Sequence, residues 1–245
     1  ESLRLWCIQS KISCMRIPLT RYGLPQAAVF PAAAVVLMAV TGLAGSVLPA
    51  AVTVSAEIIL LLLFIWIISF FRDPHRVTPE ENDILFSPAD GKVTDVEQVE
   101  TDEFEGPVLR IGIFLSIFNV HINRSPCRAA VESVVYRPGE YRNAMSAESG
   151  RVNESNDIVM VREQEPRHRL MVRQISGAIA RRIVCEAEEG TELYAGQKFG
   201  MIKFGSRTEL YAPAGEGVEI LAEPGDKVKA GLSGLVRYET AREQS

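Results

Sequence analysis

The 245-residue sequence is poor in the residues that usually form metal and redox sites. It contains three histidines and four cysteines, and the cysteines are Cys7, Cys14, Cys127 and Cys185. No pair of them has the spacing of a zinc ribbon or a dithiol motif, so we expect reduced thiols, no metal site and no redox centre. No neighbouring residue supports a nucleophilic role for Cys127 either. The formal net charge of −5, without a basic stripe, argues against a nucleic-acid partner.

Charge is nearly absent from residues 27–71, where Glu57 is the single charged residue. A membrane crossing needs roughly 20 apolar residues, so this block is too long for one helix and suits two. We expect helices at 27–43 and 52–71, joined by a turn at 45–49. The run LLLLFIW has no polar face for a soluble helix, and the block is too long for a signal peptide. For the Ala-rich first helix, a re-entrant or interfacial segment is the alternative.

Basic residues flank the apolar block on both sides, at Arg16, Arg21, Arg72 and Arg76. The positive-inside rule therefore places both ends of the hairpin, and the domain that follows, on the cytoplasmic face of the cell membrane. This organisation divides the chain into a basic N-terminal segment at 1–26, a membrane anchor at 27–71 and a globular domain at 72–245.

From residue 83 onward the pattern changes to short, β-branched apolar runs separated by glycine and proline, which predicts a mainly β domain with antiparallel sheets. We expect helix only at 178–185 and in a short turn at 143–148. Residues 188–196 and 223–231 share an acid, a glycine, an apolar residue and a final Ala-Gly at the same offsets. This repeat resembles barrel-sandwich folds and predicts a duplicated β domain made of two related halves.

A Gly-Ser bond at Gly205-Ser206 lies between two apolar, strand-like runs. Taken alone, this dipeptide is most often a bend. Glycine also allows close approach to its carbonyl, and a serine hydroxyl that loses its proton to a base can attack that carbonyl and convert the amide to an ester. Elimination from this ester, followed by exchange of the amino-terminal nitrogen for oxygen from water, would turn Ser206 into a pyruvoyl group, a ketone that reacts with amines and withdraws electrons.

Six segments occur in one order: RDPHRVTP at 72–79, SPADGKV at 87–93, FNVHINRSP at 118–126, RPG at 137–139, Asn153-Glu154, and FGMIKFGS at 199–206. Together they resemble the phosphatidylserine decarboxylase proenzyme family in its short form. The resemblance implies a pyruvoyl-dependent carboxy-lyase that converts phosphatidylserine to phosphatidylethanolamine. It also implies autocatalytic cleavage between Gly205 and Ser206, with the pyruvoyl cofactor formed from Ser206.

The same resemblance implies the site residues. A lone histidine such as His121 is more often structural, and Asp90 in its tight turn is equally suited to a local Asx turn. By resemblance, Asp90, His121 and Ser206 form the self-processing constellation, with Asp90 orienting His121 and His121 taking the serine proton. His121 is then the candidate proton donor during decarboxylation. No role for Asn153 and Glu154 follows from the residues, and Arg207 departs from relatives that have a second hydroxyl residue there.

Arg72, Arg76 and Lys92 are candidates to hold a lipid phosphate, with simple flanking of the anchor as the alternative for the two arginines. The implied partners are a membrane aminophospholipid and the two fragments of one precursor, and a homo-oligomer is also compatible with the sequence. An ether-linked archaetidylserine would present the same head group. A non-enzymatic barrel-sandwich carrier or membrane adaptor is the rival class, although the sequence has no coiled-coil heptads and neither Lys203 nor Lys227 is set for modification.

Overall fold

The computed structural model describes residues 19–101, 103–146, 148–178, 182–203 and 205–239. The chain divides into two compact units, Glu1–His75 and Arg76–Ser245. The first contains a short 3-10 helix η1 (Arg21–Gly23) and the helices α2 (Leu24–Ala44) and α3 (Ala50–Phe70). The second contains fourteen described strands and the short helix α4 (Ser149–Val152).

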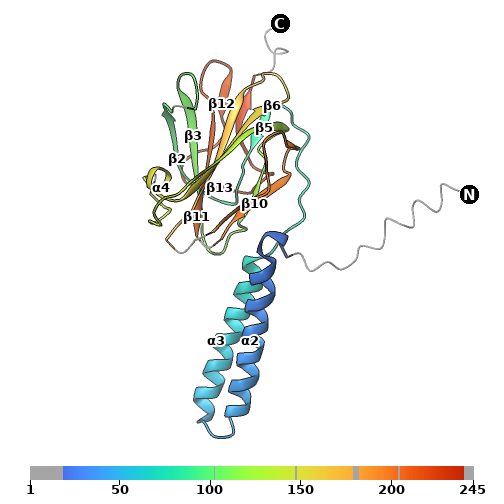
Figure 1. The fold of residues 1–245 in the computed structure, drawn as a ribbon, viewed down its shortest axis with the longest axis vertical. Coiled ribbons are helices and arrows are strands. Elements are labelled where there is room, and N and C mark those ends of the chain that lie inside the picture. Colours follow the sequence, from blue (N-terminus) through green and yellow to red (C-terminus); the bar gives the residue numbers. More distant parts are fainter. Residues whose placement is uncertain (1–18, 102, 147, 179–181, 204, 240–245) are drawn as a thin grey trace, which may run out of the picture. The chain divides into compact units, whose positions relative to one another are not determined.

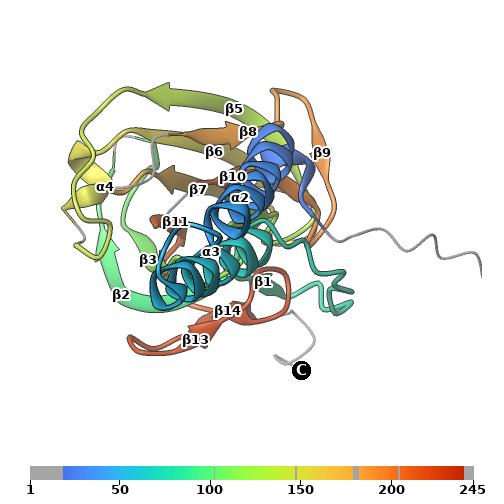
Figure 2. The same cartoon turned by 90° about the horizontal axis from the view of Figure 1, so that it is seen from below.

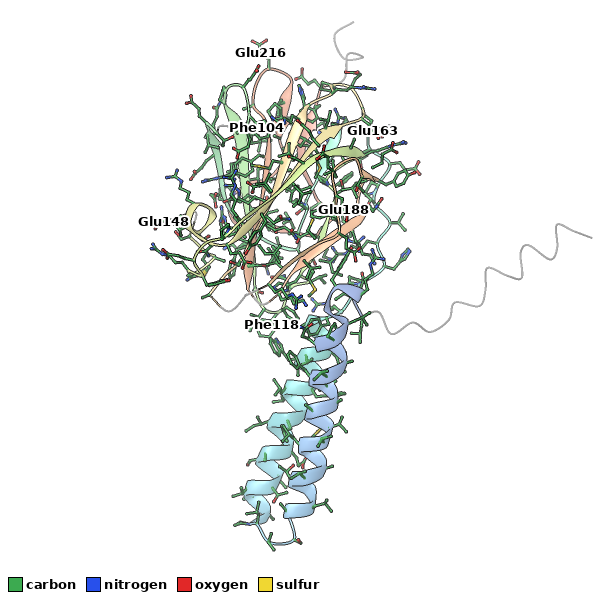
Figure 3. All side chains as sticks on the ribbon, viewed as in Figure 1. Phe104, Phe118, Glu148, Glu163, Glu188 and Glu216 are labelled. Atoms are coloured by element: carbon green, nitrogen blue, oxygen red, sulfur yellow. The ribbon has the colours of Figure 1, made fainter. Side chains whose placement is uncertain are left out.

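Helices α2 and α3 pack side by side as a hairpin (Figure 1), which confirms the two predicted helices with bounds shifted by up to three residues. Both are long and apolar enough to cross a membrane. Twenty-one residues at 1.5 Å each span about 31 Å, close to the thickness of a bilayer core. Their side chains are almost entirely carbon (Figure 3), and Val29, Leu43 and Ile59 are more than half exposed. The Thr41 hydroxyl donates a hydrogen bond to Glu57 and so gives the one carboxylate of the hairpin a partner.

All strand pairs of the second unit are antiparallel, as expected from the alternating sequence. One sheet has eight strands in the order β13-β2-β3-β11-β7-β6-β5-β9, and it curls around an apolar core (Figure 2). Two small sheets have the orders β1-β14-β12 and β4-β10-β8. The strands are β1 (Ile84–Phe86), β2 (Gly91–Val99), β3 (Val108–Leu115), β4 (Ile122–Arg124), β5 (Ala129–Arg137), β6 (Ser155–Arg162), β7 (Arg169–Ile175), β8 (Ile183–Cys185), β9 (Glu192–Leu193), β10 (Lys198–Ile202), β11 (Ser206–Pro213), β12 (Val218–Ile220), β13 (Lys227–Val228) and β14 (Gly234–Tyr238).

The strand order confirms the predicted duplication. The eight-stranded sheet reads β13-β2-β3-β11 from one edge and β9-β5-β6-β7 from the other, and the small sheets match in the same way. The two repeated segments supply the edge strands β13 and β9. Register shifts also recur at equivalent places, between Val93 and Asp95 in β2 and between Val131 and Ser133 in β5.

The two halves are nested rather than consecutive. Strands β4–β10 form one half, here called the inserted half, which interrupts the other between β3 and β11. The interrupted half, here called the split half, consists of β1–β3 and β11–β14. The chain therefore crosses between halves twice, once after β3 and once before β11.

The prediction of a helix at 178–185 is wrong for residues 183–185, because Ile183–Cys185 is strand β8. Its residues pair with Gly200, Met201 and Ile202 of β10, and this distant partner together with two β-branched residues overrides local helix propensity. The turn expected at 143–148 contains no helix in its described residues. The short helix α4 begins just after it, at Ser149, where Gly150 fits against the Glu209 carboxylate.

Candidate active site

The two crossings between the halves lie side by side. The first, at 116–121, ends at His121, and the second, at 203–205, ends at the Gly205-Ser206 bond. The amide N–H of Ile202 donates to the His121 carbonyl at 3.2 Å. The Gly205 N–H donates to Nε2 of the His121 ring at 3.3 Å. The nested topology thus brings a histidine to a Gly-Ser bond from which it is 84 residues away in the sequence.

The hydrogen bonds of His121 define its protonation state. The side chain is fully buried, and its Nδ1 lies 3.0 Å from the Asn119 carbonyl oxygen. Since a carbonyl only accepts, Nδ1 carries the proton, and Nε2 presents a lone pair to the Gly205 amide. With Nδ1 as donor and Nε2 as acceptor, the ring shows the hydrogen-bond pattern of a neutral imidazole whose lone pair lies at the Gly205-Ser206 junction.

Ser206 begins the central strand β11, opposite Leu115 of β3. Its side chain has 0% exposure, and its hydroxyl makes no hydrogen bond within the described part of the chain. Gly205 has a φ of +62°, in the left-handed region that favours glycine. A buried hydroxyl without a partner is costly to folding and usually has another reason to be present. The Gly205-Ser206 junction therefore combines a hydroxyl that makes no hydrogen bond within the described residues, a nearby imidazole and a left-handed glycine.

Asp90 does not pair with His121 in the structure, which differs from the contact that the triad interpretation expects. Its two carboxylate oxygens accept hydrogen bonds from Arg76 at 2.5 and 2.7 Å, and one of them also accepts the Ala230 N–H at 2.9 Å. Arg76 donates in addition to the Ala230 carbonyl at 2.9 Å. The bidentate guanidinium satisfies Asp90, while the Asn119 carbonyl takes the place beside His121 that the carboxylate would need.

A ladder of buried amides connects the turn containing Asp90 to the strand of Ser206, and the sequence did not predict it. Asn123 donates to the Pro88 carbonyl at 3.4 Å and to the Thr208 hydroxyl at 3.0 Å. Its side-chain oxygen accepts a hydrogen bond from Gln174 at 2.9 Å, and Gln174 accepts one from Asn156 at 3.2 Å. Asn123 and Gln174 stand beside Arg124 and Arg173 in the sequence, so no local pattern marked these two amides as buried.

The opposite face of β11 carries a buried ionic cluster. The Arg207 guanidinium, 0% exposed, donates to Asp95 at 2.7 Å, to Glu209 at 2.7 Å and to the Thr94 hydroxyl at 2.7 Å. Burial alone would lower the pKa of Arg207, but the Glu209 and Asp95 carboxylates raise it overall. Burial likewise favours a higher pKa for Asp95, yet the hydrogen bonds from Arg207 and Thr94 leave it below its ordinary value. This cluster anchors the backbone immediately after Ser206.

The three basic residues predicted to hold phosphate have different surroundings. Lys92 lies on β2 with an exposed side chain, and Arg76 is engaged by Asp90. Arg72 belongs to the first unit, where its guanidinium donates to the Ser69 carbonyl at 2.6 Å.

Among the described residues no cluster of histidine, cysteine and acidic side chains is placed to hold a metal. Burial raises the pKa of the Cys127 thiol to about 12, which makes it a poor nucleophile.

Comparison with known proteins matches residues 63–234 to the family described as phosphatidylserine decarboxylase, a region that includes His121 and Ser206. This chain belongs to the phosphatidylserine decarboxylase family. Two curated relatives are named phosphatidylserine decarboxylase proenzyme. The one from Rhodopirellula baltica is 46% identical over 170 residues, which cover 69% of this chain and 70% of the relative. The one from Carboxydothermus hydrogenoformans is 42% identical over 193 residues, which cover 78% and 89%. As a member of the phosphatidylserine decarboxylase family, the chain is an enzyme of the carboxy-lyase class.

Proposed function

We propose that the chain is a proenzyme that cleaves itself between Gly205 and Ser206 and then decarboxylates phosphatidylserine to phosphatidylethanolamine. One observation carries the proposal. The Ser206 hydroxyl is buried and makes no hydrogen bond within the described residues, while the adjacent Gly205 amide contacts the unprotonated nitrogen of His121. The relatives' names, which include the word proenzyme, support the same conclusion.

The chain's own residues supply the chemistry of cleavage. The Ser206 oxygen attacks the Gly205 carbonyl carbon, its proton passes to Nε2 of His121, and the amide becomes an ester as the Ser206 nitrogen leaves and is protonated. The imidazolium so formed keeps its Nδ1–H on the Asn119 carbonyl. Loss of the Ser206 Cα proton then breaks the Cβ–O bond and releases the Gly205 carboxylate. Water displaces the nitrogen as ammonia and leaves a pyruvoyl group at position 206.

The residues around position 206 suit such a group. Ser206 heads a strand paired on one side with β3 and on the other with β7, so the new terminus is held at a fixed place. When bound, a pyruvoyl ketone captures the substrate amine and withdraws electrons from the bond to the departing carboxylate. His121 lies beside this position with a nitrogen suited to deliver a proton to the product.

Asp90 acts, in this proposal, by positioning. Together with Arg76 it holds both the N–H and the carbonyl of Ala230. Ala230 belongs to the fragment 206–245 and Asp90 to the fragment 1–205, so these contacts join the two products of cleavage. The strands do the same on a larger scale, because β11 pairs with β3 and β7, β13 with β2 and β14 with β1. Cleavage therefore leaves a two-chain enzyme with an intact sheet.

The apolar hairpin supports a membrane-borne substrate. We place α2 and α3 across the cell membrane with the second unit on the cytoplasmic side, where an aminophospholipid head group is available. The exposed Lys92 is the candidate for the lipid phosphate, since Arg76 is already engaged. An ether-linked serine lipid offers the same head group, and a soluble amino acid would not require the anchor.

The test compares the full chain with its Ser206→Ala variant in detergent. The unmodified chain should run as fragments 1–205 and 206–245, with the small one blocked to N-terminal sequencing, reactive to a carbonyl reagent, and active in releasing CO2 from phosphatidylserine vesicles. Ser206→Ala should stay intact and inactive, whereas Ser233→Ala in the same fragment should behave like the unmodified chain. An uncleaved chain that is fully active would refute the mechanism, and an unmodified chain that stays uncleaved and inactive under these conditions would refute self-cleavage.

A further inference from the structure

The segment that follows β7 lies against the bond to be cut. The last pair between β7 and β11 joins Ile175 to Arg207, and continuing this antiparallel register by two residues brings Ser176 opposite Ser206 and Gly177 opposite Gly205. A Cβ added to Gly177 would overlap the Gly205 carbonyl oxygen and lie 3.1 Å from its carbonyl carbon. The scissile carbonyl therefore occupies the space that any side chain at 177 would fill.

Ser176, next to Gly177, has a second buried hydroxyl without a hydrogen bond among the described residues. Its side chain has 0% exposure, and its hydroxyl makes no hydrogen bond within the described residues. Directly opposed residues of an antiparallel pair project to the same face, so Ser176 and Ser206 share one face of the sheet. A buried hydroxyl without a partner is costly to folding, and a purely structural position would avoid that cost by having alanine.

The backbone of Ser176 is held firmly while its hydroxyl is not. The Ser176 N–H donates to the Glu154 carbonyl at 2.9 Å, and its carbonyl accepts from the Asn153 side chain at 2.8 Å. Asn153 is itself fixed, because it accepts the Arg142 N–H at 2.9 Å and donates to the Arg142 carbonyl at 2.9 Å. Asn153 and Glu154, whose role the sequence left open, thus hold the segment that faces the scissile bond.

We propose that Ser176 is a catalytic residue of self-cleavage, and that Gly177 leaves the room in which the Gly205 carbonyl reacts. The inference rests on the proposed cleavage at Gly205-Ser206. As the Ser206 oxygen bonds to the Gly205 carbon, the carbonyl electron pair moves onto the Gly205 oxygen, and the Ser206 proton goes to His121. The Ser176 O–H donates a hydrogen bond to this oxyanion and keeps its own proton. A hydroxyl that is free in the ground state and bonded in the transition state lowers the barrier selectively.

The experiment follows cleavage of newly synthesised full-length chain in a cell-free translation system with detergent, sampled over time. Removing one oxyanion donor typically slows a reaction about 10²–10³-fold, and we expect that loss for Ser176→Ala. Ser176→Thr keeps the hydroxyl and should retain most of the rate. Gly177→Ala displaces the scissile carbonyl and should be at least as slow as Ser176→Ala. Gly215→Ala is the matched control, because Gly215 has open space around its Cβ position and should cleave normally.

Thermal unfolding separates catalysis from folding. In the uncleavable Ser206→Ala background, adding Ser176→Ala removes an unsatisfied hydroxyl and should leave the melting temperature unchanged or higher. A slow Ser176→Ala chain with unchanged stability and a fast Ser176→Thr chain supports the proposal. Equal rates for the unmodified chain and Ser176→Ala, or equally slow Ala and Thr variants, would overturn it. If the unmodified chain itself does not cleave, the underlying self-cleavage proposal fails instead.

Discussion

Arg207 stabilises strand β11, which begins at Ser206, and its replacement by glutamine should lower the stability of the domain by an amount that the structure allows us to estimate. The side chain is fully buried, and its positive charge offsets Asp95 and Glu209, the second of which is also fully buried. Arg207→Gln leaves Glu209 with the Tyr211 hydroxyl at 2.7 Å and no direct cation. Breaking a buried pair by removing one partner costs about 3–5 kcal/mol. For a domain of this size that corresponds to a fall in melting temperature of roughly 6–20 °C.

The measurement is thermal unfolding of the full chain in detergent, followed by circular dichroism. It uses the Ser206→Ala background, so that every chain is uncleaved. Arg167→Gln is the control, because Arg167 is 70% exposed and pairs with Glu165 at 3.6 Å, a contact worth roughly 0–1 kcal/mol. Equal melting temperatures for the two variants would refute the view that the buried cluster anchors β11.

The same variant affects the processed enzyme differently. After the proposed cleavage, Arg207 would be the second residue of the fragment 206–245, while Asp95 would belong to the fragment 1–205. Its ion pair with Asp95, at 2.7 Å, then acts between two chains close to the reactive terminus. Arg207→Gln should therefore release the small fragment at a lower urea concentration than the unmodified protein, as measured by size-exclusion chromatography. Release at the same urea concentration would show that strand pairing alone holds the fragments together.

Three further predictions concern single groups. The pKa of Asp95 is lowered in the folded state, so its stabilising contribution is present above about pH 4, the ordinary range of an unfolded aspartate. This contribution is lost as the pH falls through the folded pKa, so the difference in unfolding free energy between the unmodified chain and Asp95→Asn should shrink on acidification. A difference that stays constant with pH contradicts this prediction. His121→Gln should slow cleavage about 10²–10⁴-fold by gel assay, because glutamine cannot accept the proton, and unchanged cleavage would assign the base elsewhere. Cys127, only 4% exposed with its pKa raised to about 12, should resist maleimide at pH 8 in the native state and react after unfolding, as peptide mass mapping would show; rapid native labelling is the contrary result.

Local pattern was sufficient for several features. The apolar runs predicted α2 and α3 within three residues, because a helix that crosses a bilayer needs an uninterrupted apolar length that no other element requires. The repeated glycine turns at 188–196 and 223–231 indicated two related halves, and the strand order contains them. The motifs around His121 and Gly205-Ser206 also selected residues that the structure brings into contact.

The class of the protein could thus be predicted from its residues: an apolar helical hairpin, a duplicated β domain and a Gly-Ser junction in a family of decarboxylases. The tertiary structure set which residues contact one another. It nested one half inside the other, so that His121 meets Gly205, turned Asp90 to Arg76 instead of His121, and made a strand of Ile183–Cys185. It also set Gly177 against the Gly205 carbonyl. The physical reason is that hydrophobic periodicity and turn chemistry act over a few neighbouring residues, whereas register, burial and hydrogen-bond partners depend on strands that are distant in the chain.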